Sequence, residues 1–280
     1  MDCVLIASGS KGNCIYVGND TDAVVIDAGI GYIQRTISEV GLPANNVRAL
    51  LLTHEHSDHV RSAKAYLRAA KIPVAGSGGT ISATAAAGLI PAGTRQILMR
   101  EYESLPLNSL TVHSFRTYHD AAEPTGFVVD DGDARIGICL DTHQVSPAML
   151  EELATCDAVV LESNYSEPAM KTDTFEACRE CRNCGAACGG FCPVRRLYPR
   201  YLKDRIIQDG HLSNESSSAA VSALKDAVGT FALAHLSENY NRPNIARTHA
   251  EDAVRESGAQ IFVSDQHPMY REKRMVRFSI

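Results

Sequence analysis

A chain of 280 residues is long enough to bury a full hydrophobic core, as one large domain or two small ones. With 45% apolar and 21% charged residues it is not expected to be disordered, and a net charge of −6 argues against a protein that coats nucleic acid non-specifically. The N-terminus has no signal-peptide pattern, and the longest uncharged stretch, 72–94, carries five glycines and two prolines. We therefore expect a cytoplasmic protein without a membrane span.

Short β-rich runs alternate with helical patterns along the chain. The first three runs are separated by Gly, Ser, Asn and Asp, which is typical of an antiparallel meander. In chain order we predict strands over 3–8, 14–18, 23–29 and 47–53, a helix over 59–70, strands over 110–118, 125–131 and 134–142, a helix over 146–154, a strand over 157–163, helices over 199–207 and 214–228, a strand over 230–237, a helix over 244–257 and a strand over 259–265.

The connections between these elements restrict the fold class. Several strand pairs are joined too tightly for the crossover that parallel neighbours need. We expect an α/β fold with a mixed sheet, or with two packed sheets and helices outside them. Ser146 and Pro147 are expected to begin the helix over 146–154 as its N-cap and first residue. Residues 171–197 fit neither period and are interpreted as an insertion in a single domain over 1–280.

Three histidines, a glutamate and an aspartate occupy residues 54–59, His-Glu-His-Ser-Asp-His, directly after a predicted buried strand. A loop at the end of a strand can bring side chains together without straining the sheet. His54 and His56 alternate along an extended backbone and can point to one side. Asp58 and His59 can then turn to a second position close by. Imidazoles with a carboxylate suit Zn, Mn or Fe(II), so this segment predicts a metal site.

One segment cannot fill two coordination shells, so other strand ends should contribute ligands. His119 follows the strand over 110–118, and Asp141 closes the strand over 134–142. The H-x-H-x-D-H segment, the later His in "HDAAEPTG" and the Asp that closes a later strand resemble the metallo-β-lactamase superfamily. This resemblance implies an αββα four-layer sandwich with two divalent metal ions (Zn, Mn or Fe) on one edge.

Further segments resemble the YycJ/WalJ branch, which is related to the nuclease-type enzymes of this superfamily. They are "ASGSKGNC", "HDAAEPTGF", "LESNY", "YPRYLKDRI", "GHLSNESS" and "AHLSENYNRPNIA", and the resemblance runs from Asp2 to about Arg255, except for the insertion. By resemblance, one metal is bound by His54, His56 and His119, the other by Asp58 and His59, and Asp141 bridges the two.

Three further histidines compete for the last place in the metal site. His235 ends an apolar strand, as a ligand would, and by resemblance also lies where related phosphodiesterases have a protonating His. His211 opens a helix, where its ring can contact a phosphate with help from the helix N-terminus. His267 is the third candidate. We favour His235 in the site, His211 beside it and His267 outside.

The expected chemistry is hydrolysis by a hydroxide that two close metals activate and position. Asp58 is expected to orient this nucleophile, and His235 or His211 to protonate the leaving oxygen. Ser8, Ser10, Asn13 and Thr117 are candidates for substrate contacts. The first three lie in the turn "SGSKGN", which is rich in glycine and can approach a phosphate.

The first functional hypothesis is a phosphodiesterase, an exonuclease acting on DNA or RNA. The resemblance supports it, and residues 171–205 hold eight basic and four acidic residues in an otherwise acidic chain. The second hypothesis is hydrolysis of a small acyl substrate, a thioester or a lactone, which a narrow uncharged pocket would favour. The third is an iron–sulfur redox or regulatory protein whose cysteines sense an oxidant.

Five of the nine cysteines fall within fifteen residues of the predicted insertion, with the spacing C-x2-C-x2-C-x3-C-x3-C-P. They are Cys178, Cys181, Cys184, Cys188 and Cys192. The first four match the C-x2-C-x2-C-x3-C run of bacterial-type ferredoxins, although the proline follows the fifth. We predict a 4Fe-4S cluster. A structural Zn site is the rival, but it usually pairs two separated C-x2-C knuckles. Disulfides fit poorly with a cytoplasmic chain.

Anaerobically purified protein should therefore be brown and contain iron and acid-labile sulfide, because thiolates so close in sequence can wrap one cluster. Elemental and sulfide analysis checks this. A colourless protein with one thiolate-bound zinc, in addition to any metal bound by the histidines, contradicts the cluster and leaves a structural zinc site.

Overall fold

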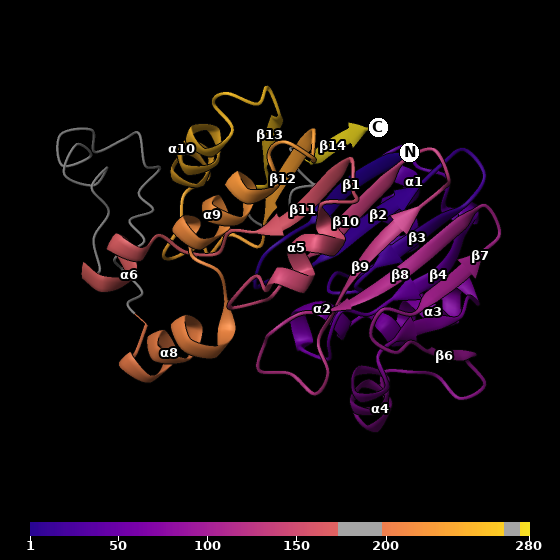
Figure 1. Cartoon of the computed structure of the whole chain (residues 1–280). Coiled ribbons are helices and arrows are strands. Elements are labelled where there is room, and N and C mark those ends of the chain that lie inside the picture. The colour runs from indigo at the N-terminus through magenta and orange to yellow at the C-terminus, as the bar shows by residue number, and fades with distance from the viewer. Residues whose placement is uncertain (173–197, 266–274) are drawn as a thin grey trace.

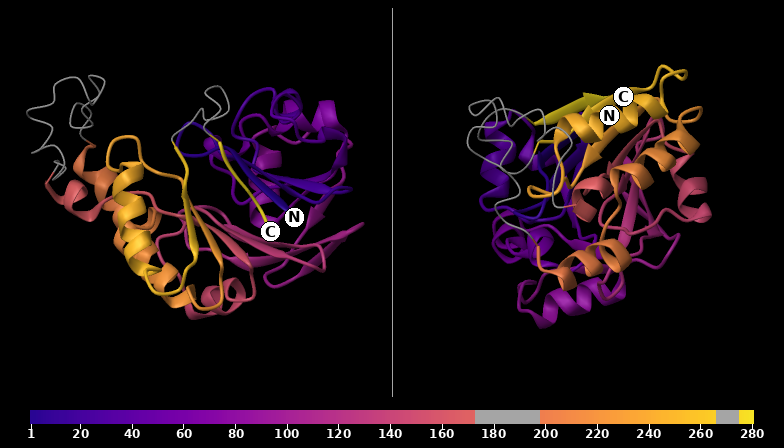
Figure 2. Two further views of the ribbon diagram at one scale, coloured as in Figure 1. Left: turned by 90° about the horizontal axis from the view of Figure 1, so that it is seen from above. Right: turned by 90° about the vertical axis from the view of Figure 1, so that its left-hand side faces the viewer.

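Two seven-stranded sheets face each other, and helices cover the outer face of each (Figures 1 and 2). The computed structural model describes residues 1–172, 198–265 and 275–280. The predicted αββα sandwich is confirmed. The insertion lies outside the described residues from residue 173 on, and so do its five cysteines and His267; Lys171 and Thr172 end a helix instead.

The first sheet is formed by the N-terminal part of the chain and by the last strand. The neighbours from β14 through β1 and β2 to β3 pair antiparallel, and the neighbours from β3 to β6 pair parallel. In spatial order the strands are β14 (Val276–Ser279), β1 (Asp2–Ala7), β2 (Cys14–Gly18), β3 (Ala23–Ile26), β4 (Val47–Leu51), β5 (Val74–Gly76) and β6 (Gln96–Leu98).

The second sheet is also mixed. Four strands pair parallel, from β13 to β10, and the pairs from β10 to β7 are antiparallel. In spatial order they are β13 (Gln260–Val263), β12 (Thr230–Ala234), β11 (Ala158–Glu162), β10 (Arg135–Cys139), β9 (Thr125–Asp130), β8 (Leu110–Arg116) and β7 (Ser104–Leu107).

The helices divide between the two outer faces. The helices of the first sheet are α1 (Ile33–Glu39), α2 (Ser57–Val60), α3 (Ala63–Ala70) and α4 (Gly78–Ala86), with a short 3-10 turn over Ala44–Asn46. The second sheet carries α5 (Pro147–Leu153), α9 (Asn214–Leu224) and α10 (Pro243–Ala253). Two further helices, α6 (Glu167–Thr172) and α8 (Arg200–Arg205), lie beyond the sheets (Figure 1). No helix in the described ranges is long and apolar enough to cross a bilayer.

Three apolar layers explain why many strands read as continuous apolar runs. In β3, Val24 and Ile26 face the other sheet, whereas Ala23 and Val25 face the helices of the first sheet. A third layer lies between the second sheet and its helices. Strands buried on both faces lose the alternation of polar and apolar residues. The four scattered cysteines at positions 3, 14, 139 and 156 are buried in these layers, as small apolar residues often are.

Several predicted boundaries are corrected. The helix predicted over 59–70 is two helices, because Asp58 O accepts from Asn13 N, and Ser62 N donates to Ala28 O instead of continuing the helix. The helix predicted over 199–207 ends at Arg205 and continues as a π turn, Ile206–Gly210. The Ser146 cap with Pro147 is confirmed. The prediction from the sequence omitted α1, β5, β6, β7, α6 and β14, and for α4 it gave only a short helix within 72–94, without bounds.

Asp22, in the turn between β2 and β3, joins the two sheets at the edge opposite to residues 54–59. Its carboxylate accepts hydrogen bonds from Arg48, from Ser109 Oγ at 2.7 Å and from Asn108 Nδ2 at 3.1 Å. Burial alone would raise the pKa of Asp22, but these donors outweigh it and hold that pKa well below its usual value. A lowered folded-state pKa stabilises the fold above the unfolded pKa, and this stabilisation is lost as the pH falls below about 4.

Asp22→Asn should therefore lower the free energy of unfolding at pH 7 by about 1–3 kcal/mol, since hydrogen-bond donors lose a charged partner. Urea unfolding at pH 7 and at pH 3 measures this, and the difference from the wild type should shrink at the lower pH. Asp20→Asn, at an exposed position two residues away, is the control. An equal loss at both pH values would contradict the linkage.

Candidate metal centre

The candidate ligands lie at one edge of the sandwich, in segments that follow strands; Asp58 and His59 belong to the short helix α2 and the others to loops. Residues 54–59 follow β4, His119 follows β8, Asp141 follows β10 and His235 follows β12. The backbone at Asp141 and His235 is left-handed, with φ of 47° and 55°. Residues other than glycine adopt this conformation at a cost, and such positions cluster at functional sites. The strand ends therefore turn abruptly where they direct these two side chains into the site.

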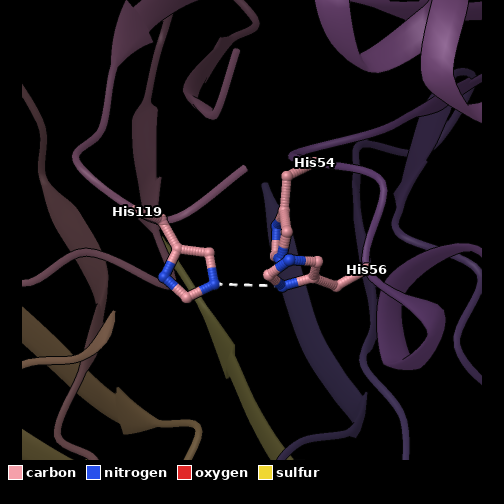
Figure 3. A group of neighbouring side chains, drawn as sticks. All are labelled: His54, His56 and His119. Atoms are coloured by element: carbon pink, nitrogen blue, oxygen red, sulfur yellow. Dashed lines mark hydrogen bonds between the residues drawn. The ribbon is translucent and has the colours of Figure 1, made fainter. Parts of the chain in front are cut away.

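The first group joins His54, His56 and His119 (Figure 3). His119 Nδ1 donates to the Gly210 carbonyl at 2.6 Å, which leaves a lone pair on Nε2, 3.1 Å from His56 Nδ1. His54 Nδ1 lies 3.1 Å from the Thr53 hydroxyl, so His54 Nε2 is the nitrogen that faces the group. Within the described residues, this buried Nε2 has no hydrogen-bond partner. Three imidazole nitrogens therefore converge, as ligands of a divalent cation do.

The second group joins Asp58, His59, Asp141 and His235. His59 Nδ1 donates to the carboxylate of Asp27 at 2.7 Å, so His59 Nε2 faces Asp141 Oδ2 at 3.3 Å. His235 Nε2 lies 3.5 Å from Asp58 Oδ2. A carboxylate behind a histidine fixes its tautomer and ring orientation, as in many metal sites.

Asp141 lies between the two groups. Its Oδ2 is 3.6 Å from His54 Nε2 and 3.7 Å from His119 Nε2 on one side. On the other side the same oxygen faces His59, and Oδ1 lies 3.3 Å from His235 Nδ1. This carboxylate is therefore placed to contact cations in both groups.

The electrostatics of the second group favour positive charge. Burial alone would lower the pKa of His59, but Asp141, Asp27 and Asp58 outweigh it and raise that pKa well above its usual value. Burial also opposes protonation of His235, yet Asp141 and Asp58 help to raise its pKa to about 10. Two divalent cations would supply the positive charge that these carboxylates attract.

The buried atoms without partners fit bound metal. Of the nine buried side-chain atoms in the described residues that lack a qualifying hydrogen bond, three are His54 Nε2, His235 Nε2 and Asp141 Oδ1. Buried polar atoms are rarely left so, because each unmade bond costs about 1–3 kcal/mol. All three atoms belong to the two groups, and imidazole nitrogens with carboxylate oxygens suit Zn, Mn or Fe(II). The residues present therefore fit a dinuclear centre.

A third group of possible ligands shares Asp141 and His235 with the second and adds His211 and Glu162. The sequence predicted His211 beside the site but not Glu162. His211 Nδ1 is 2.6 Å from Oε1 of the fully buried Glu162. The same Oε1 lies 3.2 Å from His235 Nδ1, and Oε2 accepts from the backbone N–H groups of Thr142 and Leu212. Burial lowers the pKa of His211, but Glu162 outweighs it and the net shift is upward. Glu162 thus favours the protonated form of an imidazole at the edge of the cluster.

The site opens into a pocket of about 260 Å³ that reaches Ser10, Asp120, Arg205 and His211. Of the four predicted substrate contacts, Ser10 is exposed and lines this pocket. Asn13 is fully buried, and its amide nitrogen lies 2.9 Å from His59 Nε2. The other two, at positions 8 and 117, are buried as well. The positions of these three favour support of the loops over contact with substrate.

Asp27, Thr53, Glu162 and Asn164 were absent from the sequence prediction of the site. Asp27 and Thr53 support His59 and His54, and Asn164 Nδ2 donates to the His235 carbonyl at 2.8 Å. Each follows or closes an apolar strand. Their position at strand ends could have indicated that they belong to the site, since parallel strands end together at one edge of a sheet.

Asp27→Asn should weaken metal binding by about 10–100-fold, because His59 loses the charged partner that orients it and raises its basicity. Competition with a chromogenic chelator measures the affinity. Asp133→Asn, at an exposed position in the β9–β10 turn, should bind metal as the wild type does. An unchanged affinity in Asp27→Asn would show that this carboxylate does not support a metal ligand.

Comparison with known proteins agrees with this fold. Residues 7–147 match the family model of the metallo-beta-lactamase superfamily. The chain is 28% identical to the exodeoxyribonuclease YycJ of Bacillus anthracis, over 91% of this chain and 89% of that protein. It is 24% identical to the exodeoxyribonuclease WalJ of Streptococcus pneumoniae, over 86% and 84%. The metallo-beta-lactamase fold protein YhfI of Bacillus subtilis has a similar fold, with a TM-score of 0.71, 13% identity and 99% coverage of both chains. With half of its length matched by the family model, the chain belongs to the metallo-beta-lactamase superfamily.

Proposed function

We propose that this chain is a metal-dependent phosphodiesterase that acts as an exonuclease on nucleic acid. The observation that carries the proposal is the position of His211, whose Nδ1 lies 2.6 Å from Glu162 beside the candidate metal ligands, a contact that favours the protonated ring. Hydrolysis of a phosphodiester expels an alkoxide, which needs a proton. The similarity to two exodeoxyribonucleases over most of the chain supports the same reaction.

In this proposal His54, His56 and His119 hold one metal, Asp58, His59 and His235 hold the other, and Asp141 contacts both. Two divalent cations at these positions would activate a water molecule and offset the charge that develops on the phosphate oxygens. Asp58, which is 20% exposed at the pocket wall, orients the attacking water through its second oxygen. The residues behind the ligands keep the site from rearranging when the substrate binds.

His211 has the second role, as proton donor to the leaving oxygen. Because Nδ1 is committed to Glu162, Nε2 is the nitrogen that can deliver a proton into the pocket. The ring stacks against His235 with the centroids 5.1 Å apart, which fixes its direction. The deeper His235 has its Nε2 next to Asp58 and suits a ligand better than a donor.

The two alternative hypotheses have less support. An acyl hydrolase was expected to have a narrow uncharged pocket, whereas this pocket is lined by Asp58, Asp120, Asp141 and Arg205. A thioester would also expel a thiolate, which can leave without a proton, so His211 would not be needed as a proton donor. The redox hypothesis depends on the cysteines of the insertion, which lie outside the described residues and stay a prediction.

The most direct experiment is purification without chelator, metal analysis, and assay against end-labelled DNA and RNA. We expect two divalent metals per chain and stepwise release of nucleotides from an end. Removal of the metals should abolish activity, and Zn or Mn should restore it. A metal-replete protein that degrades neither polymer would contradict the proposed function.

Substitutions of the two histidines distinguish their roles. His211→Ala should retain both metals and lose turnover by about 10²–10⁴-fold, because the leaving oxygen has no proton donor. His235→Ala should lose metal together with rate. Metal content and kcat, measured on the same preparations, check both outcomes, and His249→Ala on α10 is the control. Full metal content in His235→Ala would move His235 from ligand to proton donor.

A further inference from the structure

Helix α8 forms one wall of the metal pocket, although it lies beyond both sheets (Figure 1). Tyr198, Leu202, Arg205 and Ile206 all line the pocket. Leu202 lies three and four residues before Arg205 and Ile206, which places these three on one face of α8 and the turn that continues it, and Tyr198 precedes the helix. The π turn that follows α8 ends at Gly210, so the same segment delivers His211 to the site. The wall and the candidate proton donor are therefore parts of one continuous segment.

Arg205 carries the pocket's fixed positive charge. Among the described residues that line the pocket it is the only Lys or Arg, whereas Asp58, Asp120 and Asp141 are all acidic. Its guanidinium pairs with the carboxylate of Asp120, whose other oxygen lies 3.3 Å from His119 Nε2. Arg205 thus places a positive charge in the pocket wall, one residue away from a candidate metal ligand.

The pair of Arg205 and Asp120 can exchange partners at little cost. The Arg205 side chain is 52% exposed and that of Asp120 is 27% exposed, so water screens their attraction. A guanidinium presents a planar fork that fits two phosphate oxygens, and such bidentate contacts are stronger than an exposed ion pair. A phosphate that enters the pocket can therefore displace Asp120 from Arg205.

Tyr201 lies beside Arg205 on the helix surface, because residues four apart are neighbours. Its side chain is large, apolar and 73% exposed. An exposed aromatic ring next to a cation is a common device for holding a single strand, in which the bases stack and the phosphates pair with charge. Together these two residues offer one phosphate contact and one stacking platform.

We propose that α8 binds the strand being digested: Arg205 leaves Asp120 to hold the phosphate next to the scissile one, and Tyr201 stacks on an adjoining base. The proposal rests on the proposed nuclease function and adds how the strand is held, by contacts that do not depend on its sequence. Neither contact reads the edge of a base, which suits an enzyme that must move along any strand.

The test compares Arg205→Ala, Arg205→Lys and the control Arg200→Ala on end-labelled oligonucleotides over a range of salt concentrations. Arg200 lies on the same helix, is 95% exposed and is absent from the pocket wall. Arg205→Ala should raise KM about tenfold or more and reduce the slope of log(kcat/KM) against log[salt] by about one, with unchanged metal content. Arg205→Lys should restore the slope but only part of the KM, and Arg200→Ala should match the wild type.

Tyr201 is tested by a second pair of variants. Tyr201→Ala should raise KM without changing the salt slope, because stacking releases no counterions, and Tyr201→Phe should restore the KM. Wild-type KM and slope in Arg205→Ala would overturn the phosphate contact. Loss of metal in Arg205→Ala would show that Arg205 only positions His119 through Asp120.

A wild-type enzyme that degrades no oligonucleotide would refute the proposed function itself, and this proposal with it.

Discussion

Asp141 and Glu162 are buried carboxylates at the ends of two neighbouring parallel strands, and mainly imidazoles and backbone N–H groups stand opposite them. A buried carboxylate is costly unless its charge is compensated. Glu162 is compensated by two histidines and two backbone donors. Asp141 is less well supplied, since its Oδ1 lacks a qualifying hydrogen bond. We therefore interpret Glu162 as a carboxylate that orients histidines and Asp141 as a candidate metal ligand.

The rest of the site can be understood as support for that arrangement. Asp27 holds His59, the Gly210 carbonyl holds His119, and Glu162 holds His211 and His235. Each contact commits one ring nitrogen and leaves the other for the centre. The backbone is equally constrained at Gly29, where a Cβ would lie 1.7 Å from the Asp58 carbonyl oxygen. Any larger residue there would displace the loop that carries Asp58.

The two ends of the sandwich differ in how well their polar groups are satisfied. At the end opposite to the site, Asp22 is saturated with donors and joins the two sheets. At the site, polar atoms are left without partners and the backbone at Asp27, Asp141 and His235 is left-handed. The residues that stabilise the fold and those of the candidate site thus lie at opposite ends of the strands. The three apolar layers lie between them.

The local sequence was sufficient to predict the strands of the core and the candidate metal ligands in residues 54–59. Residues 54–59 are contiguous, so their density of imidazoles and carboxylates was visible without a fold. His119, Asp141 and His235 each follow a strand, but resemblance to a family was needed to join them to the same site. The short strands β5 and β6 and helix α1 were missed, because segments of three to seven residues carry little periodicity.

Tertiary structure alone decided which isolated polar residues belong to the site. Asp27 and Glu162 are single acids in or after apolar strands, and nothing in the neighbouring residues shows that they face histidines from elsewhere in the chain. Arg205 looked like one of many basic residues between 171 and 205 until α8 placed it in the wall of the pocket. The physical reason is that ligand identity depends on residue type, which the sequence contains, whereas the partner of a buried charge depends on distances between strand ends that only folding sets.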